Sequence, residues 1–138
     1  MASEHKLDAE VLTPEGQVFA GELFMLSTRT SVGEVGIRAR HAPMVARLEP
    51  TELRLHHSES EMERYAQGEG WLEVFANRAR VLVAEAHAPD ELDVASLRQR
   101  LADAQQRLSE AEEGSAARDS AEREKARCEA FIAIAESS

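Results

Sequence analysis

The chain has 138 residues, a formal net charge of −10, and 30% charged against 43% hydrophobic residues. This length suits one ordinary domain, or one small domain with an appended element. The acidic balance argues against nucleic acid as a main partner and against insertion into or docking on anionic lipid, because binding to either needs a concentrated positive field.

Short strands with turn residues between them occupy roughly the first 85 residues, a pattern typical of an antiparallel β-sandwich or barrel. Gly21 is expected to mark a bend or bulge, and 28–32 a polar loop. Gly33 and Gly36 are expected to frame another short, apolar strand, followed by a polar turn that carries His41. The other expected strands are Leu7–Thr13, Gln17–Ala20, Leu23–Ser27, Met44–Leu48, Glu52–His57, Glu63–Ala66, Trp71–Phe75 and Arg80–Glu85.

The character of the sequence changes at Pro89, where two helices are expected to begin. Asp90 is a candidate cap for the first helix, and Asp93 suits its positive first turn. Gly114 breaks the pattern, and Ser115 is a candidate cap for the second helix. The apolar seam of the first helix is Val94, Leu97, Leu101, Ala104, Leu108 and Ala111; that of the second is Ala117, Ala121, Cys128, Phe131 and Ala135, interrupted by the charged Glu124.

The short connection between these helices predicts an antiparallel hairpin. At about 25 cal/mol per Å² of apolar burial, the alanine-rich second seam contributes little against the entropy of ordering about twenty residues. We therefore expect a detachable hairpin. The predicted fold class is β + α, with a sandwich domain over 1–88 and a helical hairpin domain over 89–138.

One stretch carries a recognisable signature: Gly33-Glu34-Val35-Gly36-Ile37, followed by His41-Ala42-Pro43. It resembles the Gly-Glu-x-Gly-Ile…His-x-Pro signature of the epsilon subunits of F-type ATP synthases, which are called delta in mitochondria. Bacterial members often carry Pro-Gly before the histidine, where this chain has Ala39-Arg40. Further similar segments are Val11–Gly16, Gly21–Leu23, Gly70–Val74, Asn77 and Val81–Glu85.

The resemblance implies a non-catalytic rotor subunit without cofactor, at the foot of the central stalk. Its partners would be the gamma subunit and the polar loops of the c-ring, contacted around Glu34 and His41. It would be peripheral, on the cytoplasmic face of a bacterial membrane.

In bacterial relatives the hairpin either folds on the sandwich or extends along gamma into the catalytic head of alpha and beta subunits. Extended, it blocks ATP hydrolysis, with basic residues of the second helix facing the beta subunit. The candidates here are Arg118, Arg123, Lys125 and Arg127. The same arginines also fit a merely solvated helix face.

Some relatives bind ATP at an Ile/Leu-Asp-x-x-Arg-Ala motif in the first helix. This chain matches it at Leu92 and Asp93 but has Ser96 and Leu97 where the motif has arginine and alanine. An ATP-binding sensor that uses Asp93 is therefore one alternative function. A small β-sandwich enzyme that uses His41 with Glu34 is another, although no phosphate loop or nucleophile motif accompanies the pair.

Other compositional signals predict a soluble, cytosolic protein. The N-terminal six residues lack the apolar core of a signal peptide, and no run approaches the roughly 18 apolar residues of a membrane span. Cys128 is the only cysteine, and five scattered histidines give no metal-ligand spacing, so no metal site is expected. Trp71 is expected in the core, and His87 in solvent.

Overall fold

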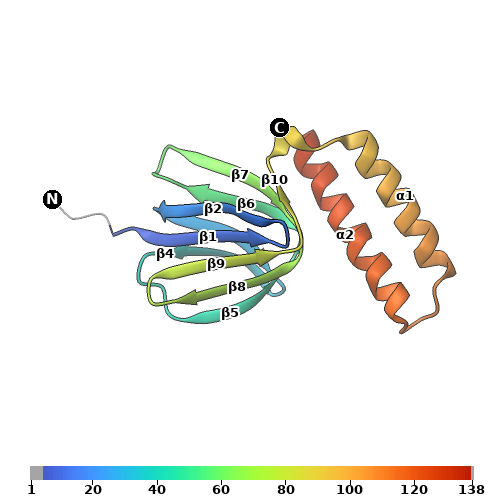
Figure 1. The fold of residues 1–138 in the computed structure, drawn as a ribbon, viewed down its shortest axis with the longest axis horizontal. Helices are drawn as coiled ribbons and strands as arrows, with labels where there is room; N and C mark the ends of the chain where they lie inside the picture. The colour runs from blue at the N-terminus through green and yellow to red at the C-terminus, as the bar shows by residue number, and fades with distance from the viewer. Residues whose placement is uncertain (1–4, 138) are drawn as a thin grey trace.

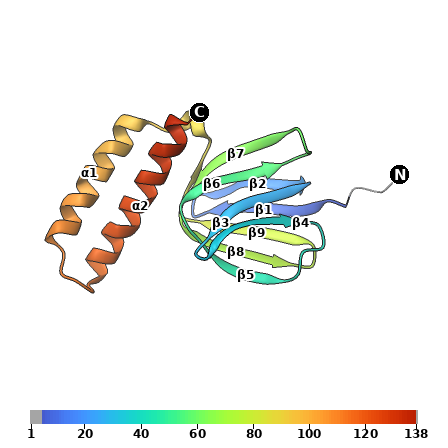
Figure 2. The same cartoon turned by 180° about the vertical axis from the view of Figure 1, so that it is seen from behind.

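The computed structural model describes residues 5–137. This part of the chain forms ten strands followed by two helices, and Figures 1 and 2 show the strands stacked as a sandwich with the helices at one end. The strands are β1 (Leu7–Thr13), β2 (Gly16–Leu23), β3 (Met25–Thr30), β4 (Gly33–Arg38), β5 (Met44–Leu48), β6 (Thr51–His56), β7 (Met62–Gln67), β8 (Gly70–Phe75), β9 (Arg78–Val83) and β10 (Ala86–His87). The 3-10 turn η1 (Pro89–Glu91) precedes helices α1 (Val94–Glu110) and α2 (Ala116–Glu136).

The strand order is β10-β7-β6-β3-β5-β8-β9-β1-β2, with β4 on the other edge of β3. β3 pairs with β6 through its first half but meets β5 at a single residue pair, Thr30 with Leu48, where one layer passes into the other. Neighbouring strands are antiparallel except β1 and β9, which run parallel. The expected sandwich is confirmed, with this one parallel pair as a departure from a purely antiparallel sheet.

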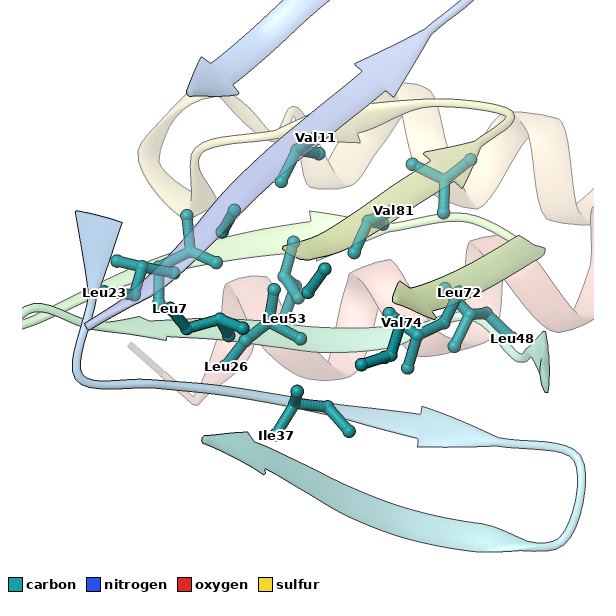
Figure 3. Close-up of a cluster of buried hydrophobic side chains, with 14 residues drawn as sticks. Leu7, Val11, Leu23, Leu26, Ile37, Leu48, Leu53, Leu72, Val74 and Val81 are labelled. Carbon is teal, nitrogen blue, oxygen red and sulfur yellow. The ribbon is translucent and has the colours of Figure 1, made fainter. Parts of the chain in front are cut away.

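The core lies between the two layers and follows the alternation of each strand. In β1, for example, Leu7, Ala9 and Val11 are buried while Asp8 is exposed. Figure 3 shows these side chains meeting others from β3, β4, β6, β8 and β9. The fully buried leucines and isoleucine of this cluster are Leu7, Leu23, Leu26, Ile37, Leu48, Leu53, Leu55 and Leu72.

Three expectations within the first hairpins are wrong. Gly21 does not bend its strand: it stays paired with Ala9, and the register shift lies further along the hairpin, between the pairs Val11–Phe19 and Leu12–Gln17. The expected strand Leu23–Ser27 is broken at Phe24, between β2 and β3. The expected polar loop 28–32 is mostly strand, because β3 continues to Thr30 and its threonine hydroxyls find hydrogen-bond partners inside the fold.

Both helices are capped by side chains. The Asp93 carboxylate accepts a hydrogen bond from the Ser96 amide at 3.2 Å, and the Ser115 hydroxyl accepts one from the Arg118 amide at 3.1 Å. Ser115 was expected in this role. Asp90 was not correctly assigned, because it lies in η1, and the cap of α1 is Asp93.

The hairpin is folded against the sandwich, and α2 lies between the sandwich and α1 (Figures 1 and 2). A small apolar cluster holds the contact: Ala66 of β7, Leu97 of α1, and Phe131 and Ile134 of α2 are buried together. The expected α1 seam is buried or half-buried throughout. In α2, Ala117 is exposed and Ile134 is buried, which corrects the predicted second seam.

Candidate functional site

Glu34 and His41 lie at opposite ends of β4. Glu34 pairs with Arg29 near the end of β3, and β3 ends beside Leu48 at the helix-facing end of the sandwich. The turn that carries His41 follows the far end of β4. Because a strand of six residues spans roughly 17–20 Å, the structure does not bring these two side chains together. The carboxylate–imidazole pair that the enzyme alternative requires is therefore not formed.

β4 pairs only with β3, so it is an edge strand. Gly36 and the side chains of Glu34 and Arg38 are exposed along it, while Ile37 is buried in the core. A partner surface that runs along this edge would reach both candidates, one at each end.

The His41 turn is held by a left-handed residue and by Asn77. Arg40 has φ of 66°, in the region that glycine adopts most easily. Its amide donates to Asn77 Oδ1 at 3.0 Å, while Asn77 Nδ2 donates to the Lys6 carbonyl at 2.8 Å. The turn therefore keeps the backbone of a glycine-containing turn although this chain has arginine there. His41 Nδ1 lies 2.7 Å from the Ala42 carbonyl oxygen and can donate to it.

The four basic candidates on α2 do not share one face. At about 100° per residue, Arg118 and Lys125 fall on one side of the helix, and Arg123 and Arg127 on the opposite side. Arg118 points to α1, where Nη1 donates to the Leu108 carbonyl at 3.4 Å. The structure places Arg127 against the sandwich instead.

Arg127 belongs to a network of five charged side chains that joins both helices to the sandwich. Its Nε and Nη2 donate to the two oxygens of Glu69 at 3.0 and 2.6 Å, and its Nη1 donates to Glu85 and Glu124, each at 3.0 Å. Arg100 of α1 donates to the same two carboxylates: to Glu85 at 3.1 Å, and to both oxygens of Glu124 at 3.0 Å. Arg100, Glu85, Arg127 and Glu124 thus close a ring.

The pKa values in this network follow from that geometry. Burial raises the pKa of Glu69, but hydrogen bonds from Arg127 outweigh it, so its pKa is lowered overall. Glu85 behaves in the same way: burial raises its pKa, while His87, Arg100 and Arg127 lower it below the ordinary value. The hydrogen bonds of Arg100 to Glu124 raise the pKa of that guanidinium. Glu69 and Glu85 are therefore carboxylates at neutral pH, and Arg100 and Arg127 are cations.

His87 and Trp71 depart from their expected environments. His87 is half-buried: its Nε2 lies 2.8 Å from a Glu85 oxygen, and its ring meets Phe131 edge-on at 6.0 Å. Trp71 is 48% exposed, not core, and the Arg47 guanidinium lies 5.5 Å from its ring centre. It lines a groove of about 560 Å³ between the sandwich and α2, together with Arg123.

Sequence reasoning missed Glu69, Glu85 and Arg100 as site residues, and treated Glu124 only as an interruption of an apolar seam. That interruption was the available signal, because a charge on the buried stripe of a helix needs partners. Its partners are Arg100 of α1 and Arg127, three residues further along α2. Asp93, the candidate for nucleotide binding, caps α1 in this structure.

Two classes of site are not found in the described part of the chain. Between residues 5 and 137, no three histidine, cysteine or acidic side chains are grouped as metal ligands. Neither of the helices described here has both the length and the apolar character needed to cross a bilayer.

Comparisons with known proteins agree on one family. The family described as "ATP synthase, Delta/Epsilon chain, beta-sandwich domain" matches residues 6–89. The ATP synthase epsilon chain of Persephonella marina is 37% identical over 103 residues, covering 75% of this chain and 76% of the relative. That of Sulfurihydrogenibium sp. is 29% identical over 126 residues, covering 91% of this chain and 94% of the relative.

Solved structures show the same fold. A chain in the mitochondrial ATP synthase of Euglena gracilis (OSCP/F1/c-ring) aligns with a TM-score of 0.77 at 20% identity, over 96% of this chain and 83% of that one. A chain in the central stalk/c-ring structure of the Tetrahymena thermophila mitochondrial ATP synthase gives 0.60 at 15% identity, over 97% and 99%. From the sequence matches, this chain belongs to the delta/epsilon family of ATP synthase subunits.

Proposed function

We propose that the chain is a non-catalytic rotor subunit in the central stalk of an F-type ATP synthase, coupling the catalytic head to the c-ring. The observation that carries the proposal is the alignment with ATP synthase epsilon chains, which extends through the sandwich and into the hairpin over 126 residues. The two units would be the sandwich, 1–88, and the hairpin, 89–138. As part of the F1 sector, the chain would lie peripherally on the cytoplasmic face of a bacterial membrane.

The sandwich would bind the gamma subunit and the polar loops of the c-ring. The exposed edge of β4 supports this assignment, because Glu34 and the His41 turn stand at its two ends and an edge strand offers unpaired backbone groups. A contact along β4 would use both residues, while a contact at one end of the sandwich would use only one.

The hairpin would inhibit ATP hydrolysis by extending into the head of alpha and beta subunits. Its folded position here would then be the non-inhibitory one, with Arg127 turned to the sandwich. Arg118, Arg123 and Lys125 would be available to the beta subunit with Arg127 after extension. The small apolar contact of the hairpin supports such a switch, since an element that moves must be weakly held.

Binding to gamma tests the rotor assignment. Purified full-length chain is mixed with the cognate gamma subunit, and the complex is followed by size-exclusion chromatography and calorimetry. We expect a stable one-to-one complex, weakened by His41→Ala or Glu34→Ala but not by Glu15→Ala, an exposed control in the β1–β2 turn. Failure of the unaltered chain to bind gamma would contradict the proposal.

A further inference from the structure

We propose that the ring of Arg100, Glu85, Arg127 and Glu124, with Glu69 attached, is a latch that sets how often the hairpin leaves the sandwich, and that it needs no bound ligand. The inference rests on the proposed function for its biological meaning, because only an inhibitory hairpin has to undock. The latch itself is a property of the isolated chain.

The latch joins the sandwich to both helices of the hairpin. Glu69 lies between β7 and β8, and Glu85 between β9 and β10, so both belong to the sandwich. Arg100 comes from α1, and Glu124 and Arg127 from α2. Undocking therefore breaks the bonds from both arginines to Glu85 and both bonds from Arg127 to Glu69. The Arg100–Glu124 pair can stay intact within the hairpin.

The side chains of the latch are partly shielded from solvent, so their ion pairs are screened less than those of an ordinary surface pair. The side chains of Arg127, Glu85, Glu124 and Glu69 are 18%, 19%, 21% and 26% exposed, and that of Arg100 is 34% exposed, whereas both side chains of the surface pair Arg98–Glu136 are more than half exposed. Removing one member takes hydrogen-bond partners from groups that stay partly buried: without Arg127, for example, Glu69 loses both of its bonds to that guanidinium. Such a loss costs more than losing a solvated pair. The apolar contact beside the ring consists of four buried residues, so we expect the ring to contribute strongly to the docking equilibrium.

The guanidinium groups of the latch find their hydrogen-bond acceptors within the latch itself. Arg127 uses Nε, Nη1 and Nη2 on carboxylate oxygens, and Arg100 uses Nε and Nη2. Three carboxylates face two guanidinium groups, so an added anion such as phosphate would have to displace a glutamate. The docked state is therefore expected to hold without nucleotide.

Two side chains of the chain can report on the docking of the hairpin against the sandwich. Cys128, the only cysteine, is fully buried close to the charges of Arg100, Glu85, Arg127 and Glu124, so a thiol reagent reaches it only when the packing around α2 opens. Burial also raises the pKa of its thiol. Trp71, the only tryptophan, lines the groove between the sandwich and α2. Its fluorescence reports docking independently of thiol chemistry.

The test is the rate at which Cys128 of the full-length chain reacts with a small disulfide reagent at about pH 8, where an exposed thiol ionises readily. Arg127→Met and Glu85→Gln each remove latch bonds while keeping side-chain bulk, and we expect each to speed the reaction by about tenfold or more. The matched control is Arg98→Met: Arg98 pairs with Glu136 between the same two helices at 2.5 Å, but both side chains are more than half exposed. It should change the rate by less than about twofold.

Three further measurements, with another variant, with salt and with added ligands, test the same inference. If Arg127→Met fails to fold, as judged by circular dichroism, Glu69→Gln carries the same prediction. Salt at about 0.5 M should speed the reaction of the unaltered chain and affect Arg127→Met less, because screening weakens charge pairs. Inorganic phosphate or Mg-ATP should leave the rate unchanged.

Latch variants that react no faster than the control would overturn the inference, as would protection of Cys128 that depends on ATP. Failure of the proposed function looks different. In that case the latch variants would still expose Cys128, but removal of the hairpin would leave ATP hydrolysis unaltered.

Discussion

Arg127 holds Glu69 through two parallel hydrogen bonds, Nε to Oε1 at 3.0 Å and Nη2 to Oε2 at 2.6 Å. The pair joins the second helix to a connection of the sandwich 58 residues away in the sequence. Arg127 was expected to face another subunit. In the docked hairpin it is engaged inside the chain, so it becomes available to a partner only when the hairpin leaves.

Acid should release the hairpin, and neutral pH should not. Glu69 and Glu85 have pKa values below the ordinary 4.5 because their hydrogen bonds, from Arg127 to Glu69 and from His87, Arg100 and Arg127 to Glu85, outweigh the effect of burial. Groups of this kind contribute their full stabilisation above the unfolded pKa and lose it as the pH falls through the folded pKa. Docking should therefore be constant down to about pH 4.5 and weaken below it.

Trp71 fluorescence during acid titration measures this transition. In the double variant Glu69→Gln/Glu85→Gln the hairpin should already be looser at neutral pH, and the acid-dependent change should be smaller. A transition centred above about pH 6 in the unaltered chain would point to histidine instead and contradict the prediction.

Replacing Arg40 with glycine should stabilise the sandwich. Arg40 has φ of 66°, which costs an ordinary residue about 1–2 kcal/mol. The hydrogen bond from its backbone amide to Asn77 is kept in the glycine variant. After the entropy that glycine loses on folding, a net gain of about 0.5 kcal/mol is expected in urea unfolding. The adjacent Ala39→Gly, which lacks a positive φ, should instead lower the free energy of unfolding.

Gly70 should not tolerate a side chain. An ideal Cβ at this position would lie 1.9 Å from the Leu82 carbonyl oxygen, and the β9 backbone cannot yield as a side chain can. We expect Gly70→Ala to destabilise the chain by about 3 kcal/mol or more. Gly36→Ala is the comparison, because its new Cβ meets only the flexible Met25 sulfur, at 3.3 Å, and should change stability by less than about 1 kcal/mol.

Variants of Asp93 distinguish a helix-capping role from a role in nucleotide binding. As the cap of α1, Asp93→Ala should lower the free energy of unfolding by about 1 kcal/mol, while Asp93→Ser should keep most of it. Calorimetry with Mg-ATP distinguishes the alternative. If ATP binds and both variants abolish binding, Asp93 is a nucleotide ligand as well as a cap, and the sensor function gains support.

The alternation of apolar residues was enough to predict most of the sandwich. Leu7–Thr13 and Met44–Leu48 were placed to the residue, since one face of each strand is buried. Phe24 could not be recognised as a break, because its neighbours read as one apolar run. Its position is fixed by contacts far along the chain: its amide donates to His56 at 2.8 Å, and Arg38 stacks on its ring at 4.4 Å.

The candidate site was much less predictable than the fold. Glu34, His41 and the basic residues of α2 follow from resemblance alone, because a surface that recognises another subunit has no periodicity of its own in the sequence. The charged ring depends on Glu85 and Arg100 approaching α2, and such tertiary proximity leaves no local pattern. Glu124 gave the one local sign, as a charge on a helix stripe that is otherwise buried.

ATP hydrolysis by the cognate catalytic head tests the regulatory role most directly, with the full-length chain compared with a version that ends at Ala88. Gamma binding and assembly are checked in both. We expect the truncated chain to assemble and hydrolysis to rise, because the inhibitory arm has been removed. Equal hydrolysis in two fully assembled complexes would contradict inhibition by the hairpin, and would leave the sandwich as the only part with a role in coupling.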